Sequence, residues 1–574
     1  MEPDGLHVSL GNYSGVVADA LAEAQHDNVV QRIWNKDASL WKIDATHQKL
    51  IRNALGWLTV VSEMRAVTDE LIEFADQIRG PGAFKQVMLC GMGGSSLCPE
   101  VIRQTFGRQS GYPTLLVLDS TDPDVLASFA NRVDIDHCLF IIASKSGTTT
   151  EPLVFYKYWY NQVAQRTQNP GESFVAITDP GTRMVELATE DNFRRIFLNR
   201  PDIGGRYSAL SYFGMVPAAL MGVNIRKLLS RAEGMMRLCS AESPGETNPA
   251  ALLGAILSEC AYAGRDKLTL VTDQRIAGLG LWIEQLVAES TGKEGKGILP
   301  VNGEPLGPSS VYRDDRVFVS IAVGELADET TCALNALEAA GHPVVYRSLK
   351  DAYDLGEEFF LWEFATAFAG WRLSINPFDQ PNVQESKDAT KELLKYFTRE
   401  GKVQEQRALV SDGVLTVYAD EQTRTLLPST SVREALRAHL ARVKSHDYIA
   451  FLDYVEETSE IEAAIQTIRT HLRNVTRRAT TTGYGPRFLH STGQLHKGGP
   501  DMGVFIQLTA PDKVDLPVPG ESYTFSILKQ AQALGDFRAL MSHGRRAIRV
   551  DLGEDVLVGL KRLGELIERT LLGR

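Results

Sequence analysis

The chain alternates short apolar runs with longer segments in which apolar residues recur every three or four positions. Runs of the first kind predict buried strands, and segments of the second kind predict helices. The first part of the chain has four predicted strands: Val87–Cys90, Thr114–Leu118, Leu139–Ala143 and Phe174–Ile177. Because these strands are apolar on both faces and alternate with helices, they predict a parallel, doubly wound α/β sheet. Ligands of such sheets bind beyond the carboxyl ends of the strands.

The same alternation of strands and helices returns twice further along the chain. The predicted strands are Leu268–Thr272, Val317–Ala322 and Val344–Ser348, followed by Tyr448–Val455, Val504–Leu508 and Ala547–Val550. A strand pair is predicted within Ala408–Tyr418, and another strand at Leu373, before a proline-rich turn. The loose similarity of the two sets predicts that the third lobe duplicates the second.

The length of 574 residues is too great for one hydrophobic core and predicts several lobes. We expect a helical N-terminal segment at 1–49, an α/β domain at 50–245 and a second α/β domain at 246–403. An additional C-terminal α/β lobe would occupy 404–574. Within the first domain, Leu50–Ile78 predicts one long helix that ends at a glycine- and proline-rich stop.

Composition excludes several classes of function. A net charge of −12 argues against nucleic acid or an anionic membrane as the main partner. No window of 18 apolar residues predicts a membrane span, and Met1–His26 has no apolar core typical of a signal peptide. Six scattered cysteines without a Cys-x-x-Cys pair favour a reducing compartment over disulfides or a metal site. We therefore expect a cytoplasmic protein without a bound metal.

Two hydroxyl-rich loops follow predicted strands at the same edge of the first sheet. One loop carries Ser144, Ser146, Thr148 and Thr149 just before a predicted helix, a position where helix N–H groups and hydroxyls can bind a phosphate. The alternative is an ordinary N-cap, for which one hydroxyl suffices. The other loop, Gly91–Leu97, combines glycines with serines, so its backbone can approach a ligand closely.

Charged residues at helix ends supply candidate chemistry. Arg206 follows two glycines at a predicted helix start, where it can reach an anion, although an isolated arginine there is more often in a surface ion pair. Glu289 ends an apolar helix and shares a face with Gln285, four residues earlier. Such a carboxylate suits a general base, and the alternative is a solvated helix end. Lys387 lies in the first turns of a helix, where a cation is unusual unless it serves chemistry or an anionic ligand.

Five motifs together resemble the glucose-6-phosphate isomerase (phosphoglucose isomerase) family. They are Gly91–Ser96, Ser144–Glu151, Gly204–Ser208, Gln285–Lys293 and Asn376–Lys387, in the family's order. The resemblance implies two SIS domains, each an αβα sandwich, and reversible conversion of glucose 6-phosphate and fructose 6-phosphate through a cis-enediol. The reaction that the resemblance implies requires neither a cofactor nor a metal. The segment Arg32–Trp41 also resembles the isomerase part of transaldolase–phosphoglucose isomerase fusions, and we find no transaldolase half.

The resemblance also implies roles for individual residues. Glu289 matches the base that moves the proton between C1 and C2, Arg206 the group that stabilises the enediolate, and Lys387 a lysine involved in ring opening. The remaining residues match substrate-binding positions: Gly93, Gly94, Ser95, Ser144, Lys145, Ser146, Thr149, Gln285 and Gln380.

The ring-opening histidine departs from the family's order. In the family it lies between the glutamate and the lysine, but here that interval contains only His342, in a Gly-His-Pro turn unlike the family's motif. The best match is His490, within Leu489–Gln494 of the third lobe, with His496 as the fallback. Family members are usually dimers in which the partner supplies this histidine. We therefore expect that the third lobe can replace the partner, so that the chain could act as a monomer, while a homodimer stays open.

Two other functions remain open at this point. A bifunctional phosphoglucose/phosphomannose isomerase would differ only in the placement of one water or hydroxyl. A non-catalytic SIS protein that senses sugar phosphates would keep the hydroxyl loops but would not need Glu289, Arg206, Lys387 and His490 together.

Overall fold

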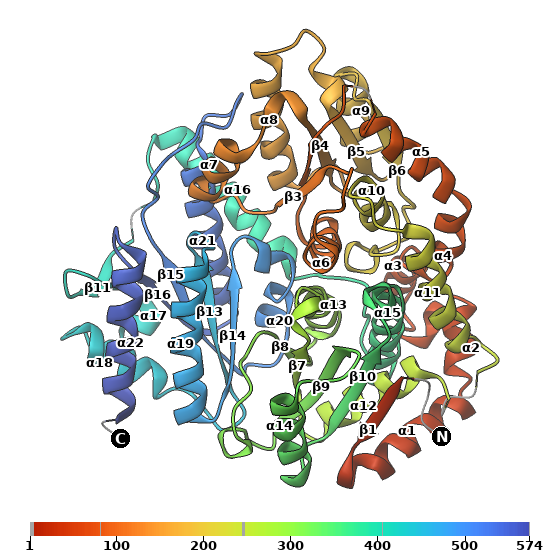
Figure 1. Cartoon of the computed structure of the whole chain (residues 1–574). Coiled ribbons are helices and arrows are strands. Elements are labelled where there is room, and N and C mark those ends of the chain that lie inside the picture. Colours follow the sequence, from red (N-terminus) through yellow and green to blue (C-terminus); the bar gives the residue numbers. More distant parts are fainter. Residues whose placement is uncertain (1–4, 81, 244–246, 405, 573–574) are drawn as a thin grey trace.

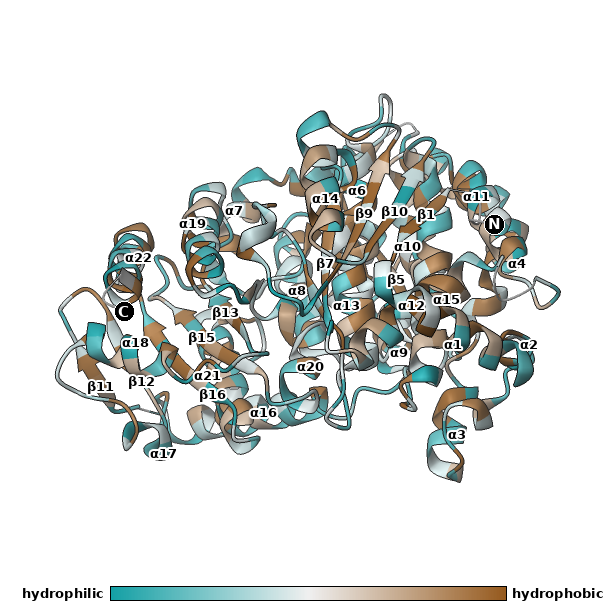
Figure 2. Cartoon of the chain, turned by 90° about the horizontal axis from the view of Figure 1, so that it is seen from below, coloured by the Kyte–Doolittle hydropathy of each residue, from teal (hydrophilic) through white to brown (hydrophobic). Residues whose placement is uncertain are grey.

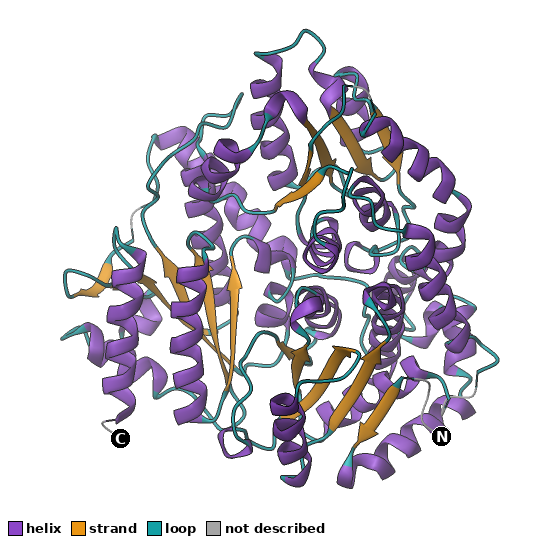
Figure 3. Ribbon diagram, viewed as in Figure 1, coloured by secondary structure: helices purple, strands orange, loops and turns teal. Residues whose placement is uncertain are grey.

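Three sheets organise the chain, each with helices on its faces (Figures 1 and 3). The computed structural model describes residues 5–80, 82–243, 247–404 and 406–572. The first sheet contains β2 (Gln86–Cys90), β3 (Thr114–Leu118), β4 (Cys138–Ala143), β5 (Phe174–Thr178) and β6 (Arg195–Leu198). The second contains β1 (Leu6–Ser9), β7 (Lys267–Thr272), β8 (Leu299–Val301), β9 (Arg316–Val323) and β10 (Val344–Leu349). The third contains β11 (Ala408–Ser411), β12 (Thr416–Tyr418), β13 (Tyr448–Tyr454), β14 (Ala479–Tyr484), β15 (Gly503–Thr509) and β16 (Arg546–Asp551).

All three sheets share one strand order. The orders are β3-β2-β4-β5-β6, β8-β7-β9-β10-β1 and β14-β13-β15-β16-β12-β11. In each sheet the first parallel strand along the chain pairs with the second on one side and with the third on the other, and the fourth follows the third. The second sheet ends in antiparallel β1 and the third in antiparallel β12. The doubly wound parallel fold is therefore confirmed. Because the first sheet has the same order, the duplication of the second lobe in the third stays a prediction.

Helices cover both faces of the sheets. In the first lobe and before it they are α1 (Ser14–His26), α2 (Val29–Trp34), α3 (Ala45–Arg52), α4 (Trp57–Ala66), α5 (Thr68–Ile78), α6 (Leu97–Phe106), α7 (Pro123–Arg132), α8 (Thr150–Ala164), α9 (Arg183–Glu190), α10 (Tyr212–Leu220) and α11 (Ile225–Leu238). The second lobe has α12 (Pro249–Tyr262), α13 (Leu279–Thr291), α14 (Asp328–Ala339), α15 (Leu355–Arg372) and α16 (Val383–Glu400). The third has α17 (Glu421–Arg424), α18 (Val432–Leu440), α19 (Ser459–Thr476), α20 (Gly493–Gly498), α21 (Phe525–Ser542) and α22 (Val556–Leu572).

Alternate residues of the strands enter different cores. In β2, Val87 and Leu89 join a large core that the first and second lobes share, whereas Met88 and Cys90 face α8 and part of the third lobe. This follows from the two-residue period of a strand, and it explains why these strands are apolar at every position. Figure 2 shows the same pattern as brown strands, such as β9 and β15, between helices of mixed colour. The lobes therefore pack as one structure through continuous apolar contacts.

Several sequence predictions of local structure are wrong. The segment Leu50–Ile78 is not one helix, because α3 ends at Arg52, a turn follows, and α4 and α5 meet at a break near Val67. No strand forms at Leu373, since this residue caps α15 and the following Ser374 has a φ of 56°. The strands β1, β6, β8 and β14 were not predicted.

The N-terminal segment belongs to the second lobe rather than standing alone. Its strand β1 pairs antiparallel with β10, and the indole N–H of Trp41 donates to the carbonyl of Ala367, 2.9 Å away. The expectation of a purely helical segment is therefore wrong for β1. The predicted boundary between residues 245 and 246 lies outside the described residues, and the domain division stays a prediction. Among the described helices, none is long and apolar enough to cross a membrane.

Candidate active site

Glu289 and Gln285 share a buried face of α13, as their spacing predicts. The Gln285 side-chain amide donates from Nε2 to Glu289 Oε2 at 3.1 Å. The same nitrogen donates to the backbone carbonyl of His490 at 2.7 Å. One amide group of the second lobe therefore links the candidate base to the loop of the third lobe that carries the candidate histidine.

Arg206 is buried and firmly held beside Glu289. Its Nη1 lies 3.7 Å from Glu289 Oε1. Its Nε donates to Ser290 Oγ at 2.7 Å, and Nη1 donates to Gln380 Oε1 at 2.9 Å. Its Nη2 donates to the carbonyls of Pro377 and Asp379. The guanidinium is thus a fixed positive charge next to the carboxylate, and Gln380 helps to hold it.

The two glycines of the first loop allow close approach of other backbones. A Cβ on Gly94 would lie 2.2 Å from the carbonyl oxygen of Gly205, next to Arg206. A Cβ on Gly93, whose φ is 56°, would lie 2.9 Å from His490 Cβ. Ser95 is buried in the short 3-10 turn Gly93–Ser95. This loop therefore joins the segments that carry Arg206 and His490.

The second hydroxyl loop does not act as an ordinary helix cap. Ser146 Oγ lies 3.0 Å from Thr148 Oγ1 and 3.5 Å from Thr149 Oγ1. Thr149 is the N-cap residue of α8, yet its side chain makes no capping hydrogen bond. Ser144 Oγ is buried and makes no hydrogen bond to the described residues. These hydroxyls at a helix N-terminus remain available to an anion.

Lys145 points away from this hydroxyl group. Its ammonium forms an ion pair with Asp179 and donates to the carbonyl of Pro201 at 3.0 Å. The structure therefore places its charge against a carboxylate, and direct contact with a phosphate would require this pair to open.

His490 contacts a buried carboxylate to which the sequence reasoning gave no role. Its Nε2 lies 3.3 Å from Oε1 of Glu151, and Gln532 Nε2 donates to the same oxygen at 2.7 Å. Burial alone would raise the pKa of Glu151, but the charge and hydrogen bond of His490, with Lys387, hold it below the usual value. Glu151 follows the hydroxyl loop directly, so its place in the motif was the available signal. Gln532 lies on α21 and had no such signal.

A cavity joins these groups to Lys387. Its lining includes Thr149, Glu151, Lys387, His490 and Gln532. Lys387 is partly buried in the first turns of α16, as predicted. The cavity therefore lies between the hydroxyl loop of the first lobe, α16, and the histidine loop of the third lobe.

His496, the fallback histidine, belongs to the apolar core. It is 3% exposed, and neither ring nitrogen has a hydrogen-bond partner. Its ring lies 5.0 Å from that of Phe505 and 6.1 Å from that of Tyr448, between centroids. Burial, with the nearby charges of Lys497 and Arg545, lowers its pKa well below the usual value. The structure therefore brings His490, and not His496, to the site.

Lys293 is a further buried cation, at the end of the Gln285–Lys293 motif. Its ammonium lies 2.7 Å from Asp379 Oδ1 and also donates to the carbonyl of Asp379. Burial, together with the charge of Arg206, lowers its pKa to about 8. Lys293 and Arg206 therefore both hold the turn that carries Gln380, a role that the sequence reasoning missed.

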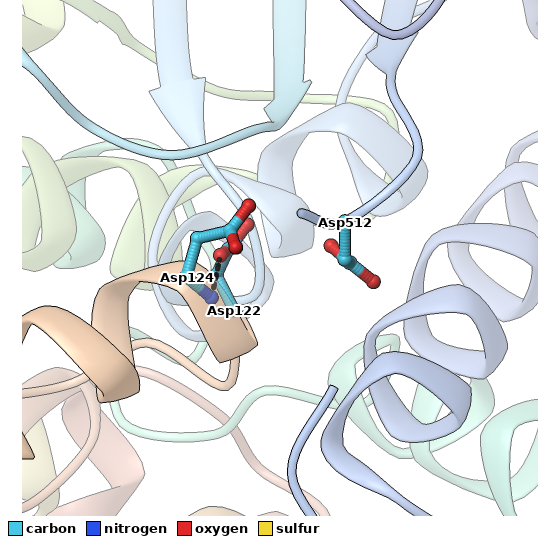
Figure 4. A group of neighbouring side chains, drawn as sticks. All are labelled: Asp122, Asp124 and Asp512. Atoms are coloured by element: carbon cyan, nitrogen blue, oxygen red, sulfur yellow. Dashed lines mark hydrogen bonds between the residues drawn. The ribbon is translucent and has the colours of Figure 1, made fainter. Parts of the chain in front are cut away.

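One group of carboxylates in the described residues has the spacing of a metal site. The oxygens of Asp122, Asp124 and Asp512 lie within 4.8 Å of one another, across the contact between the first and third lobes (Figure 4). However, the ammonium of Lys529 lies 2.8 Å from Asp122 Oδ2 and also pairs with Asp512. A lysine therefore already supplies the positive charge there, and the group ties the lobes together.

Comparison with known proteins finds similarity to one family of enzymes. The family model described as phosphoglucose isomerase matches residues 49–298. This part of the chain is therefore similar to the phosphoglucose isomerase family. The matched residues contain both hydroxyl loops, Arg206 and Glu289, whereas Lys387 and His490 lie beyond them.

Individual relatives of the phosphoglucose isomerase family cover more of the chain. A probable glucose-6-phosphate isomerase of Methanococcus maripaludis is 25% identical over 423 residues, which cover 67% of this chain and 93% of the relative. A glucose-6-phosphate isomerase of a Cyanothece species is 28% identical, over 60% of this chain and 73% of the relative. The crystal structure of a glucose-6-phosphate isomerase from Chlamydia trachomatis shares the fold, with a TM-score of 0.55 and 17% identity, over 68% of this chain and 88% of that one.

Proposed function

We propose that this chain is a glucose-6-phosphate isomerase, which converts glucose 6-phosphate and fructose 6-phosphate reversibly through a cis-enediol. The observation that carries the proposal is the link made by Gln285, whose amide joins Glu289 to the His490 loop. The similarity to glucose-6-phosphate isomerases suggests the reaction. The link supports a site in which the base and the histidine face one substrate.

The hydroxyl loop would hold the phosphate of the substrate. Ser144, Ser146 and Thr149 lie before the N-terminus of α8, where N–H groups and the helix dipole favour an anion. Held there, the phosphate would orient the rest of the sugar toward the second and third lobes. Such positioning lowers the entropy cost of the reaction.

Ring opening would be the task of His490 and Lys387. His490 would donate a proton to the ring oxygen as the bond to C1 breaks, while the C1 hydroxyl would lose its proton to water as the aldehyde forms. Lys387, across the same cavity, would supply positive charge near the oxygens. The carboxylate of Glu151 contacts the His490 imidazole and would keep that imidazole oriented toward the sugar. The open chain would then present C1 and C2 to the carboxylate of Glu289.

The isomerisation step would use Glu289 and Arg206. Glu289 would take the proton from C2 of the open aldose, which leaves an enediolate with its charge on O1. After O1 gains a proton and O2 loses one, Glu289 would return its proton to C1. The negative charge that develops on oxygen would face the guanidinium of Arg206, which four described partners hold in place. Fixed charge of this kind stabilises a transition state without reorganisation.

A coupled assay of fructose 6-phosphate to glucose 6-phosphate tests the proposal. Glu289→Gln should lower kcat by about 10²–10⁴-fold, the usual worth of a general base, with little change in folding. Glu284→Gln is the matched control, because burial raises the pKa of Glu284 to about 8 and the amide resembles its protonated form. Full activity in Glu289→Gln would show that Glu289 is not the general base. An inactive wild type would favour the alternative of a non-catalytic protein that senses sugar phosphates.

We also propose that one chain holds a complete site and that the third lobe takes the place of a partner subunit. The contacts of His490 with Gln285 and Glu151 lie within a single chain and support this arrangement. A monomer would then be active, in contrast to the dimers that are usual in the family. We also propose that the protein is cytoplasmic. The proposed domains are 50–245 for phosphate binding, 246–403 for Glu289 and Lys387, and 404–574 for His490.

A further inference from the structure

A second cavity, of about 450 Å³, lies at the junction of the second and third lobes. Arg265 stands before β7, Arg313 before β9, His342 before β10, and Arg477 directly after α19. None of these residues belongs to the candidate active site. Four segments that are distant in sequence therefore bring three arginines and one histidine to the same cavity.

The positive charge of this cavity has little compensation. Of its lining residues only Asp314 carries a negative charge, and no carboxylate of the described residues forms an ion pair with the three arginines. Arg265 is 7% exposed and instead donates to the hydroxyl of Tyr13 and the carbonyl of Arg316. A buried guanidinium without a carboxylate is costly, particularly in a chain whose net charge is −12.

Neutral donors complete the cavity. His342 Nδ1 lies 3.2 Å from Arg265 Nη1 and so accepts a hydrogen bond, which leaves the ring proton on Nε2. The hydroxyls of Ser309 and Ser310 lie on the same lining. Burial and the charges of Arg265 and Arg316, opposed by Asp314, lower the pKa of His342 to about 4, so the ring is neutral.

A neighbouring arginine adds to the positive field. Nε and Nη1 of Arg478 are buried and make no hydrogen bond to the described residues. Burial and the charges of Arg313 and Arg477, opposed by Asp315 and Asp447, lower the pKa of Arg478. Positive groups that oppose one another in this way would gain from an anion placed between them.

We propose that this cavity is a second anion site, which binds the phosphoryl group of a small molecule between the second and third lobes. Planar guanidinium groups match the oxygens of a phosphoryl group with paired hydrogen bonds, and arginine is the side chain that suits this geometry best. Arg313 and Arg477 are the residues best placed for a test. Arg313 makes no hydrogen bond or ion pair in the described residues, and the Arg477 guanidinium donates only to the carbonyl of Tyr312. The inference does not depend on the proposed function.

Calorimetry with inorganic phosphate tests the second site in the full chain. The background variant Ser146→Ala/Thr149→Val weakens the hydroxyl loop, so that the remaining phosphate binding reports on the second site. Adding Arg313→Ala and Arg477→Ala should weaken this binding at least about tenfold, or 1.4 kcal/mol. Arg183→Ala is the matched control, since Arg183 is an exposed arginine 3.9 Å from its nearest carboxylate, and it should change nothing.

The outcomes separate the second site from the first. Phosphate binding that is equal with and without Arg313 and Arg477, or absent in the background variant, overturns the proposal. Circular dichroism checks folding. The single variant Arg313→Ala, which breaks no hydrogen bond or ion pair of the described residues, should by itself weaken binding. A parallel titration with glycerol 3-phosphate tells whether free phosphate or a phosphate monoester binds more tightly. Isomerase activity measured without added phosphate should be the same in Arg313→Ala and in the wild type. The binding titrations test the second site even if the chain has no isomerase activity.

Discussion

At the scale of single residues, the motifs located side chains well but did not reveal their partners. Arg206, Glu289 and Gln285 meet as their motifs predict, because their roles depend on local spacing and on a loop at a sheet edge. Glu151 could not be assigned in advance, since its contact with His490 joins residues 339 positions apart. Lys145 illustrates the opposite error, because sequence proximity to hydroxyls says nothing about Asp179 on a neighbouring strand end.

Glu151 offers a test at this scale. Glu151→Gln should lower kcat by about 10–10²-fold with a smaller change in KM, because the variant keeps the shape but loses the charge that orients His490; a full acid/base group is worth about 10²–10⁴-fold.

The Glu151 pKa lies below its usual value of about 4.5, so its ionised form stabilises the fold above that pH. The stability gap between wild type and variant should therefore narrow as the pH falls below about 4.5. Urea unfolding at several pH values measures it, and a gap that widens at low pH would contradict the assignment.

At the scale of elements, fully buried strands were predictable and short or polar ones were not. The strands β2 to β5 have apolar residues on both faces, so their pattern is clear. In contrast, β8 has only three residues, and β14 begins with Ala-Thr-Thr-Thr, which resembles a loop. The false strand at Leu373 was an apolar pair at a helix end. The sequence predicted the positions of the loops that follow the strands. It did not predict which of these loops contact one another.

The close approach of Gly94 to the loop that carries Arg206 can be tested directly. Gly94→Ala places a Cβ 2.2 Å from the Gly205 carbonyl, so the loop that carries Arg206 must shift. We expect a loss of about 1–3 kcal/mol in unfolding free energy and a large fall in kcat. Gly234→Ala, on α11, is the control: its Cβ would meet nothing within 4 Å, and stability should stay equal or rise slightly. Equal stability and activity in Gly94→Ala would show that the close approach is unimportant.

At the scale of the whole molecule, residues of the candidate site come from three lobes. The first lobe provides the hydroxyl loops, the second provides Glu289 and Lys387, and the third provides His490 and Gln532. Ion pairs such as Lys529 with Asp122 hold the third lobe against the first. The sequence indicated the repeat but not this contact surface, because apolar periodicity carries no information about which faces of different lobes meet.

Mixing two inactive variants tests whether one chain suffices. An equimolar mixture of Glu289→Gln and His490→Ala chains should show no recovery of activity, since each complete site needs both residues from one chain. A homodimer that exchanges the histidine would instead form mixed dimers with one intact site and recover up to about a quarter of wild-type activity. Sedimentation of the wild type under the assay conditions measures independently whether the chain is a monomer or a dimer.

The separation of Glu151 from His490 also has a consequence for the synthesis of the protein. These residues lie 339 positions apart, and ribosomes add about 5–20 residues per second, so roughly 20–70 seconds pass between them. During this interval the growing chain already contains the hydroxyl loops and, later, Glu289, but it has no imidazole to meet Glu151. The cavity therefore closes only when the last lobe leaves the ribosome and docks. A chain truncated before residue 490 would keep part of its binding surface without the residue proposed to open the sugar ring.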